Sequence, residues 1–432
     1  MKAKLVQFPM GQGGFHAGFI TYRDHTTCYI FDCGSYDYKH PQPIPQTKII
    51  DHSLDYFMQL IKSYGCHEVD TLIVSHFHED HVNGLHRLLE RLKKSGIRIG
   101  KFFMPMYHDT LVEKVASIQS LGSPESGLPW AMEGRSEFIH TLAQDGTHIY
   151  VVASGEDTGE ENNERELSRD EDSGFRIVSS GRPSETQGPQ TPPAQTQVLY
   201  SPVRIRTGQS NEVWELRLWA SPALMEHQEE FCTWLEHQLS EDLGKRYPEI
   251  SVDEIAGWCF TKRGKNAIKD KTKELFPLFR GDLNETSLAV FSGPKMGTNA
   301  YSCLSSPWRD RAHRYPFWPT YAPAWLLTGD CNLNSKDGQN YDSFFQEMSA
   351  VATKVGYFCL PHHGSFKNYN MQFTSDFPNV DWWLANAGSP NSFNHPSLET
   401  LADLHAHGCT VYKVDESMNH IVVVSVCVPS TN

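Results

Sequence analysis

The residues best suited to chemistry lie in one stretch, residues 75–84, with the sequence SHFHEDHVNG. The stretch follows an apolar run, residues 69–74, and precedes a helix-like run. His76 and His78 point the same way in extended backbone because side chains alternate along a strand. Imidazole and carboxylate ligands together favour zinc, manganese or iron over magnesium or calcium alone. The stretch therefore predicts a metal site at the end of a strand, and the alternative interpretation is a solvated polar loop.

The order H-x-H-x-D-H resembles the metal motif of the metallo-β-lactamase superfamily. Other pieces follow in that family's order: Asp32 at the end of an early strand, the Thr328-Gly329-Asp330 turn, and His362-His363-Gly364-Ser365. The pattern is most similar to the soluble domain of ComEC-type DNA-uptake channels and its relatives, which include phosphorylcholine esterases. That branch also has three short motifs, found here as Gly11-Gln12-Gly13, Asn284-Glu285-Thr286-Ser287 and His395-Pro396.

The resemblance implies a site for two divalent metal ions, zinc or manganese. It assigns His76 and His78 to one ion, assigns Asp80, His81 and His363 to the other, and makes Asp330 the bridge between them. Asp80 would help to hold the ion that activates the attacking water.

Three further residues receive roles beside the metals. Asp32 is expected to orient a ligand histidine rather than to bind metal, a common task of a carboxylate behind a metal site. His362 and His395 are expected to contact substrate or to donate a proton to a leaving alkoxide. The spacing of the histidine pair equally allows the reverse assignment, in which His362 is the ligand and His363 supports it.

The first metal has an unusual ligand set. Most hydrolases of this superfamily supply it with a third histidine, whereas this chain has Asn284 at the matching position. The same change occurs in the ComEC-like branch. The alternatives are weaker binding of the first ion, use of manganese, and a ligand set completed by a substrate phosphate. His140 and His148 are substitutes, although each is expected on a helix or strand surface.

Composition predicts a globular chain with more than one ordinary core. The chain has 432 residues, of which 39% are hydrophobic. It contains no run of 18 apolar residues, so no membrane-spanning helix is predicted. The first residues lack the apolar centre of a signal peptide. The ten cysteines form no C-x-x-C pair, which favours free thiols in a reducing compartment. We therefore expect a cytoplasmic protein without membrane contact.

Strand and helix patterns alternate along both ends of the chain, and with the resemblance they imply an α/β fold. The expected fold is an αββα metallo-β-lactamase sandwich with a large insertion between its two halves. The first half spans residues 1–153 and the second spans residues 284–432. Between them, residues 154–197 are rich in Glu, Asp, Ser, Gly and Pro and predict an acidic flexible insert. Residues 198–283 predict an inserted β/α module.

Two segments allow both a functional and a structural interpretation. The expected helix at 265–279 and the residues just before it are basic. The basic residues are Lys262, Arg263, Lys265, Lys269, Lys271 and Lys273. Such a run is usually a solvated helix face, and a phosphate-contacting patch is the alternative. The long stretch 293–323 is either an active-site lid or a packed crossover.

Three functions compete at this stage. A metal-dependent phosphodiesterase or nuclease agrees best with the resemblance and with paired metals. A small-molecule hydrolase would act on a phosphoester, cyclic nucleotide, lactone or thioester. A metal-stabilised scaffold would bind a protein partner through residues 154–280. The net charge of −14 argues against a general nucleic-acid coat protein but not against a nuclease.

Overall fold

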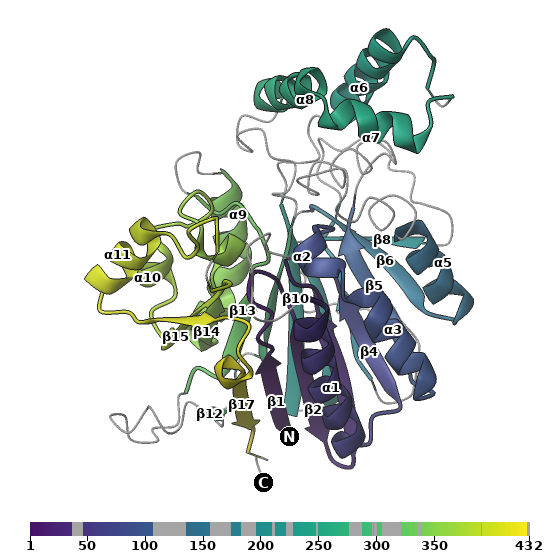
Figure 1. Ribbon diagram of the computed structural model, residues 1–432. Helices are drawn as coiled ribbons and strands as arrows, with labels where there is room; N and C mark the ends of the chain where they lie inside the picture. The colour runs from purple at the N-terminus through teal and green to yellow at the C-terminus, as the bar shows by residue number, and fades with distance from the viewer. Residues whose placement is uncertain are drawn as a thin grey trace.

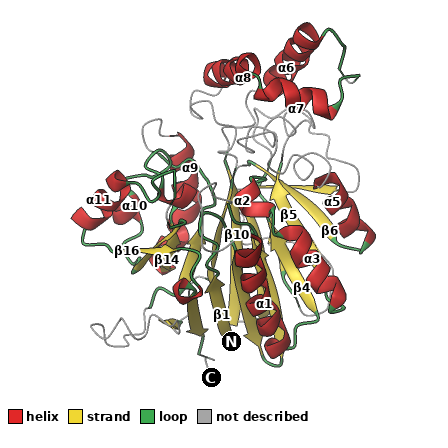
Figure 2. Cartoon of the chain, in the orientation of Figure 1, coloured by secondary structure: helices red, strands yellow, loops and turns green. Residues whose placement is uncertain are grey.

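The structure is a computed structural model that combines two mixed β-sheets with helices (Figures 1 and 2). It describes residues 1–36, 46–106, 135–155, 174–182, 196–209, 212–221, 228–247, 249–275, 287–295, 297, 300–304, 321–334, 339–389 and 391–429. The expected α/β class is confirmed. No helix in these ranges is long and apolar enough to cross a membrane.

The first sheet has nine strands within the described part of the chain, in the order β12-β17-β1-β2-β3-β4-β5-β6-β8. Its strands are β1 (Lys2–Gln7), β2 (His16–Tyr22), β3 (His25–Phe31), β4 (Glu68–Ile73), β5 (Arg98–Pro105), β6 (His148–Ala153), β8 (Thr196–Tyr200), β12 (Tyr301–Leu304) and β17 (Val422–Cys427). From β3 to β8 neighbouring strands are parallel, and the others pair antiparallel. The sheet therefore joins the beginning of the chain to its far end, because β1 pairs with β17.

The second sheet has eight strands over the same ranges, in the order β16-β15-β14-β13-β11-β10-β9-β7. Its strands are β7 (Arg176–Ser179), β9 (Val203–Gln209), β10 (Glu212–Ala220), β11 (Leu288–Pro294), β13 (Ala324–Leu327), β14 (Val355–Cys359), β15 (Trp382–Asn386) and β16 (Val411–Val414). Strands β13 to β16 are parallel. Parallel strands end at one edge, and both sheets use that edge to present polar side chains.

Buried side chains divide into layers that follow the sheets. One cluster joins the first sheet to α1 (Gln46–Tyr64), α3 (Leu85–Lys94) and α5 (Arg135–Gln144). A second cluster lies between the sheets and includes Phe103 and Trp325. A third joins the second sheet to α9 (Gln339–Met348), a 3-10 helix (Ser349–Lys354), α10 (Phe373–Asp376) and α11 (Leu398–Ala406). Helix α1 fits this arrangement because its buried residues, such as Ile50, Leu54, Phe57 and Ile61, recur at helical spacing.

Three further helices form a small unit of their own. They are α6 (Gln228–Leu243), α7 (Val252–Phe260) and α8 (Lys262–Leu275), and their buried residues make a separate apolar cluster. The serine that precedes α7, Ser251, forms a capping box with Glu254. Figure 1 shows this unit beyond the end of the sheets that carries α2 (Glu79–Val82).

The expectation of a flexible insert over 154–197 is wrong for part of that segment. Residues 176–179 form β7, which pairs with β9, and residues 196–197 begin β8. Phe175 and Ile177 are buried between the sheets, so this short apolar run joins the core in spite of its polar surroundings. Residues 156–173 and 183–195 lie outside the described residues.

The expected module at 198–283 needs correction as well. Strands β9 and β10 belong to the second sheet, where residues 214–220 of β10 pair with the whole of β11. The stretch 198–206 divides at Ser201 and Pro202 into the end of β8 in the first sheet and the start of β9 in the second. Only the helical unit α6–α8 stands apart with its own core. Part of the expected loop at 293–323 is strand β12.

Candidate metal centre

Five strand ends bring the candidate ligands together. Residues Asp32 and His76 follow β3 and β4 of the first sheet, while Asp330, His363 and Asn386 follow or end β13, β14 and β15 of the second. The backbone joins the two sheets here, because the N–H of Leu288 donates to the carbonyl of Ser75 over 2.9 Å. The carboxyl ends of parallel strands commonly form ligand sites in α/β proteins. The sheets thus place residues from both ends of the chain around one point.

The turn at 75–84 is held tightly against neighbouring loops. A Cβ at Gly34 would lie 2.5 Å from the carbonyl oxygen of Asp80, and a Cβ at Gly13 would lie 2.6 Å from it. The N–H of Gly14 donates to the same oxygen over 3.2 Å. Asn83 exchanges two hydrogen bonds with the backbone of Ser35. These close approaches explain the glycines and fix the turn that carries four candidate ligands.

The side chains form two groups of potential metal ligands. His76, His78 and Asp330 make one group, and Asp80, His81 and His363 make the other. Within each group the ligand atoms lie within 4.8 Å of one another. The division between the groups is the one expected from the sequence.

Asp330 lies between the two groups. Its Oδ1 is 3.2 Å from Nε2 of His81 and 3.6 Å from Nε2 of His363. Its Oδ2 is 3.4 Å from Nε2 of His76 and 3.7 Å from Nδ1 of His78. The two oxygens of this buried carboxylate thus face different sets of imidazoles, which is the arrangement that a bridging ligand requires.

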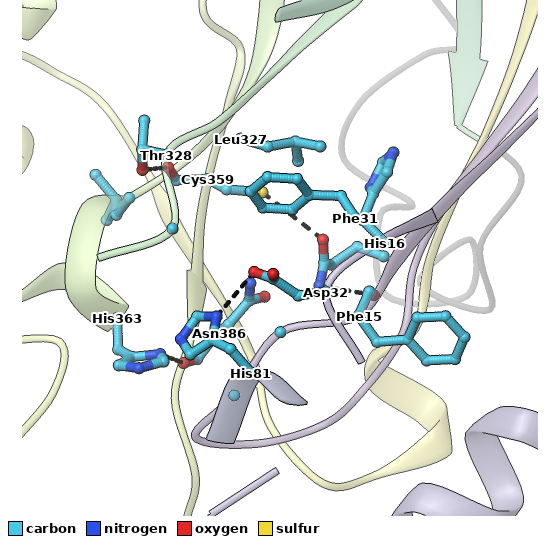
Figure 3. Close-up of a pocket in the computed structure, with 15 residues that line it drawn as sticks. Phe15, His16, Phe31, Asp32, His81, Leu327, Thr328, Cys359, His363 and Asn386 are labelled. Atoms are coloured by element: carbon cyan, nitrogen blue, oxygen red, sulfur yellow. Dashed lines mark hydrogen bonds and ion pairs between the residues drawn. The ribbon is translucent and has the colours of Figure 1, made fainter. Parts of the chain in front are cut away.

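Three of these imidazoles are oriented through Nδ1. In His81, Nδ1 lies 2.8 Å from Oδ2 of Asp32, and in His363, Nδ1 lies 2.7 Å from the carbonyl oxygen of Asn386. Both contacts appear in Figure 3. Both partners are acceptors, so the proton lies on Nδ1 and Nε2 is left for a metal. In His76, Nδ1 contacts the hydroxyl of Ser75 over 2.9 Å.

Asp32 has the supporting position expected of it. Its carboxylate accepts from the N–H and the hydroxyl of Ser75 over 2.6 and 2.7 Å, and from His81. Both of its oxygens are engaged in these hydrogen bonds. Its φ of 58° lies in the left-handed region, which Asp tolerates better than most residues. Asp32 therefore orients a ligand histidine and belongs to neither ligand group.

The site concentrates negative charge where water is excluded. Asp32, Asp80 and Asp330 are all buried, and in the part of the chain that the structure describes none forms an ion pair with Lys or Arg. The surrounding imidazoles hold the pKa of Asp330 well below its usual range even though burial acts to raise it. Buried carboxylates without compensating charge are costly, so the group suits a divalent cation.

Charge also divides the histidines. Burial and the neighbouring histidines lower the pKa of His76 to about 3, so this imidazole is neutral. Burial would lower the pKa of His81 too, but three surrounding carboxylates outweigh burial and raise it well above its ordinary value. The same three carboxylates that favour a proton on His81 would favour a metal cation at its Nε2, and binding of the cation would displace that proton.

His362 lies beside the centre but belongs to neither ligand group. Its Nδ1 contacts Oδ1 of Asn368 over 3.1 Å, and its Nε2 is 3.6 Å from Oδ2 of Asp330. The amide of Asn368 is itself fixed, because Nδ2 donates to the carbonyl of Asp330 over 3.1 Å. His362 and His363 both have positive φ, 46° and 59°, which turns the two neighbouring imidazoles apart. Of the two histidines, only His363 belongs to a group of potential ligands among the described residues.

His395 lies on the opposite side of the histidine pair. Its ring centroid is 5.4 Å from that of His362 and 6.1 Å from that of His363. The Gln12 amide contacts Nδ1 of His395 over 3.2 Å. Burial and the other histidines lower the pKa of His395 to about 3. A neutral His395 that accepts from Gln12 carries its proton on Nε2 and can donate it to a substrate oxygen.

A small internal cavity of about 20 Å³ lies behind the centre (Figure 3). It is lined from both sheets, and Asp32, His81 and His363 form part of its wall. This volume is about enough for one water molecule.

Of three other residues weighed from the sequence, two are described, and neither of these lies in the centre. Asn284 lies outside the described residues. His140 is exposed on α5, where its Nε2 contacts Gln144 over 2.8 Å, and His148 is exposed at the start of β6. Neither His140 nor His148 belongs to a ligand group, which agrees with their expected surface positions.

Sequence reasoning missed several residues that support the centre. The sequence singles out Gln12 only as part of the Gly-Gln-Gly motif, and it indicates no role for Ser75, Asn368 or Asn386. Each acts through a contact to a candidate histidine. The Gly-Gln-Gly motif was the one signal that pointed to any of them.

Comparison with protein-family models and with curated proteins found no match for this chain.

Proposed function

We propose that the protein is a metal-dependent hydrolase with two divalent cations, zinc or manganese, and that it cleaves phosphodiesters. The observation that carries this proposal is the position of Asp330. One of its oxygens faces His81 and His363, while the other faces His76 and His78. A carboxylate placed between two sets of imidazoles suits a pair of metal ions better than one ion.

The proposed ligands divide as the geometry groups them. His76 and His78 would hold the first ion, Asp80, His81 and His363 would hold the second, and Asp330 would contact both. When bound, such a pair supplies an activated water at neutral pH and positive charge for the attacking and leaving oxygens of a phosphoryl group. The resemblance to the metallo-β-lactamase superfamily and the two layered sheets support the same proposal, including the αββα form of the fold.

The chain's own residues would position the substrate beside this pair. His362 is partly exposed, and its Nδ1 is anchored by Asn368, so its Nε2 is available at the edge of the centre. His395 can donate a hydrogen bond from Nε2 because Gln12 occupies Nδ1. Two imidazoles at one edge suit a phosphoryl group, which offers several acceptor oxygens. The proposed roles are therefore substrate contact for His395 and contact or proton transfer for His362.

The direct test is a substrate screen with purified protein loaded with manganese or zinc. Bis-p-nitrophenyl phosphate, DNA, RNA and cyclic nucleotides cover phosphodiesters, and a lactone and a thioester cover the other reactions of a small-molecule hydrolase. The proposal predicts hydrolysis of at least one phosphodiester that a chelator abolishes and that Asp330→Ala lacks. Hydrolysis restricted to the lactone or the thioester would contradict it.

A further inference from the structure

An aromatic surface adjoins the candidate centre. The ring of Phe393 stacks on that of His395 at a centroid distance of 5.9 Å and an interplanar angle of 27°. The ring of Tyr36 meets Phe393 edge-on at 5.4 Å. We call Tyr36, Phe393 and His395 the aromatic platform. It begins at the centre itself, because the His395 ring also lies next to His362 and His363.

Phe393 is exposed in a way that the fold does not explain. The side chain is 46% exposed, and it belongs to none of the buried clusters. Single exposed apolar side chains are common on proteins and need no function. Phe393 differs from the other large exposed hydrophobic residues of the described ranges, because it alone has a ring contact with a residue of the centre.

The platform is held in place by hydrogen bonds on both sides of Phe393. Asn391 accepts from the N–H of His395 over 2.9 Å and donates to its carbonyl over 2.7 Å, which closes the loop that carries Phe393. The Glu416 carboxylate accepts from the N–H of Ser389 over 3.0 Å at the start of this loop. An apolar ring on a fixed loop is already arranged for binding, so little conformational entropy is lost when a ligand stacks on it.

Gln12 joins the platform to the Gly-Gln-Gly turn. Its carbonyl accepts from the N–H of Tyr36 over 2.6 Å, while its side-chain amide contacts Nδ1 of His395. A Cβ at Gly11 would lie 2.8 Å from Cγ of Glu416, so the glycine lets this turn approach the side chain that holds the start of the platform loop. One buried residue therefore positions rings that are far apart in the sequence.

We propose that the aromatic platform stacks on the base of a nucleotide whose phosphate lies at the candidate centre. This inference rests on the proposed function and deepens it by naming nucleotides as the substrate class. An aromatic ring recognises any base through its π face, without reading hydrogen bonds. The distances support this geometry, because two ring-to-ring steps of 5.9 and 6.1 Å lead from Phe393 through His395 to the proposed ligand His363.

The test compares two ligands that share a phosphate and a ribose but differ in the base. Binding of AMP and of ribose 5-phosphate to the full-length, metal-loaded protein is measured by calorimetry. The variants are Phe393→Leu, which removes the ring and keeps an apolar side chain, and Phe393→Trp, which restores an aromatic face. Leu398→Ala is the matched control, because Leu398 is 81% exposed nearby in the chain and makes no ring contact. Metal content and melting temperature show that each variant is folded.

The wild type should bind AMP roughly 5- to 100-fold more tightly than ribose 5-phosphate, the range that base–aromatic stacking supplies. This preference should fall at least about fivefold in Phe393→Leu, remain in Phe393→Trp and be unchanged in Leu398→Ala. Equal affinity of the wild type for both ligands, failure to bind either ligand, or a preference that survives in Phe393→Leu would overturn the inference. An exposed Phe393 would then be explained as a contact for a protein partner. Hydrolysis of bis-p-nitrophenyl phosphate, measured in parallel, decides the proposed function separately.

Discussion

The substitution Asp32→Asn isolates the support of one proposed ligand without removing any ligand. The carboxylate of Asp32 takes three donors: the N–H of Ser75, the hydroxyl of Ser75 and Nδ1–H of His81. Asn has nearly the same size and tolerates the positive φ of this position. The change therefore alters hydrogen bonding and charge while it leaves the backbone in place.

The expected effect follows from the number of acceptors. The amide oxygen of Asn must face the N–H of Ser75, which can only donate, so the amide NH₂ then faces Nδ1 of His81. His81 must accept there and move its proton to Nε2, the atom that lies 3.2 Å from Oδ1 of Asp330. A protonated Nε2 has no lone pair for a metal. Loss of such a partner usually costs about 10- to 100-fold in metal affinity, or about 1.4–2.8 kcal/mol.

The assay is a chelator competition titration of zinc against the wild type and Asp32→Asn. In Asp32→Asn, the zinc affinity of the group that contains His81 should fall. The zinc affinity of the other group should change less. Asp51→Asn is the control, because Asp51 forms surface ion pairs with Arg87 and Arg91 on helices outside the centre. Unchanged zinc affinity in a folded Asp32→Asn protein would refute the role assigned to Asp32.

Three further predictions test the site and the fold. Asp80→Asn and Asp330→Ala should lose metal and phosphodiesterase activity together. His362→Ala should keep its metal and lose ~10²–10⁴ in rate. If His363→Ala kept its metal and His362→Ala lost it, the two histidines would be assigned the wrong way round. Burial first, and then Glu68, raises the pKa of Asp70 from 3.8 to about 7. The unfolded chain then binds fewer protons than the folded chain between about pH 4 and 7, so stability falls as pH rises through this window. Asp70→Asn should remove that fall, which amounts to about 3 kcal/mol between pH 5 and 8. Urea unfolding at these two pH values measures it, and an unchanged difference would contradict the assignment. Phe175→Ala should lower the free energy of unfolding by about 3–5 kcal/mol because Phe175 is buried between the sheets, and a loss below about 1 kcal/mol would show that the segment around β7 does not pack.

The sequence was most informative where contacts are local. The ligand turn could be predicted because His76, His78, Asp80 and His81 lie within six residues between β4 and the end of α2, so the short segment alone keeps them close. Asp330 followed from a different signal, an aspartate directly after an apolar strand in a family-like order. The structure places Asp330 between the two ligand groups, and the spacing of residues along the chain does not predict that position.

Contacts between distant segments could not be predicted in the same way. Gln12 and His395 are 383 positions apart, and nothing in their local sequence relates them. The choice between His362 and His363 depends on positive φ angles at both residues, which no side-chain pattern encodes. Strand β7 was missed because only Phe175 and Ile177 mark it within a polar segment. Pairing with β9 stabilises β7 as a strand, whereas the local composition predicts a flexible segment.

The central claim is that the centre holds two metal ions, and metal stoichiometry tests it most directly. Protein purified without chelator is dialysed against excess manganese or zinc, freed of unbound ion and measured by elemental analysis, with Asp330→Ala in parallel. The arrangement of Asp330 between the two ligand groups predicts two ions per wild-type chain and a clear loss in the variant. A wild-type protein that never exceeds trace metal under these conditions would contradict the account.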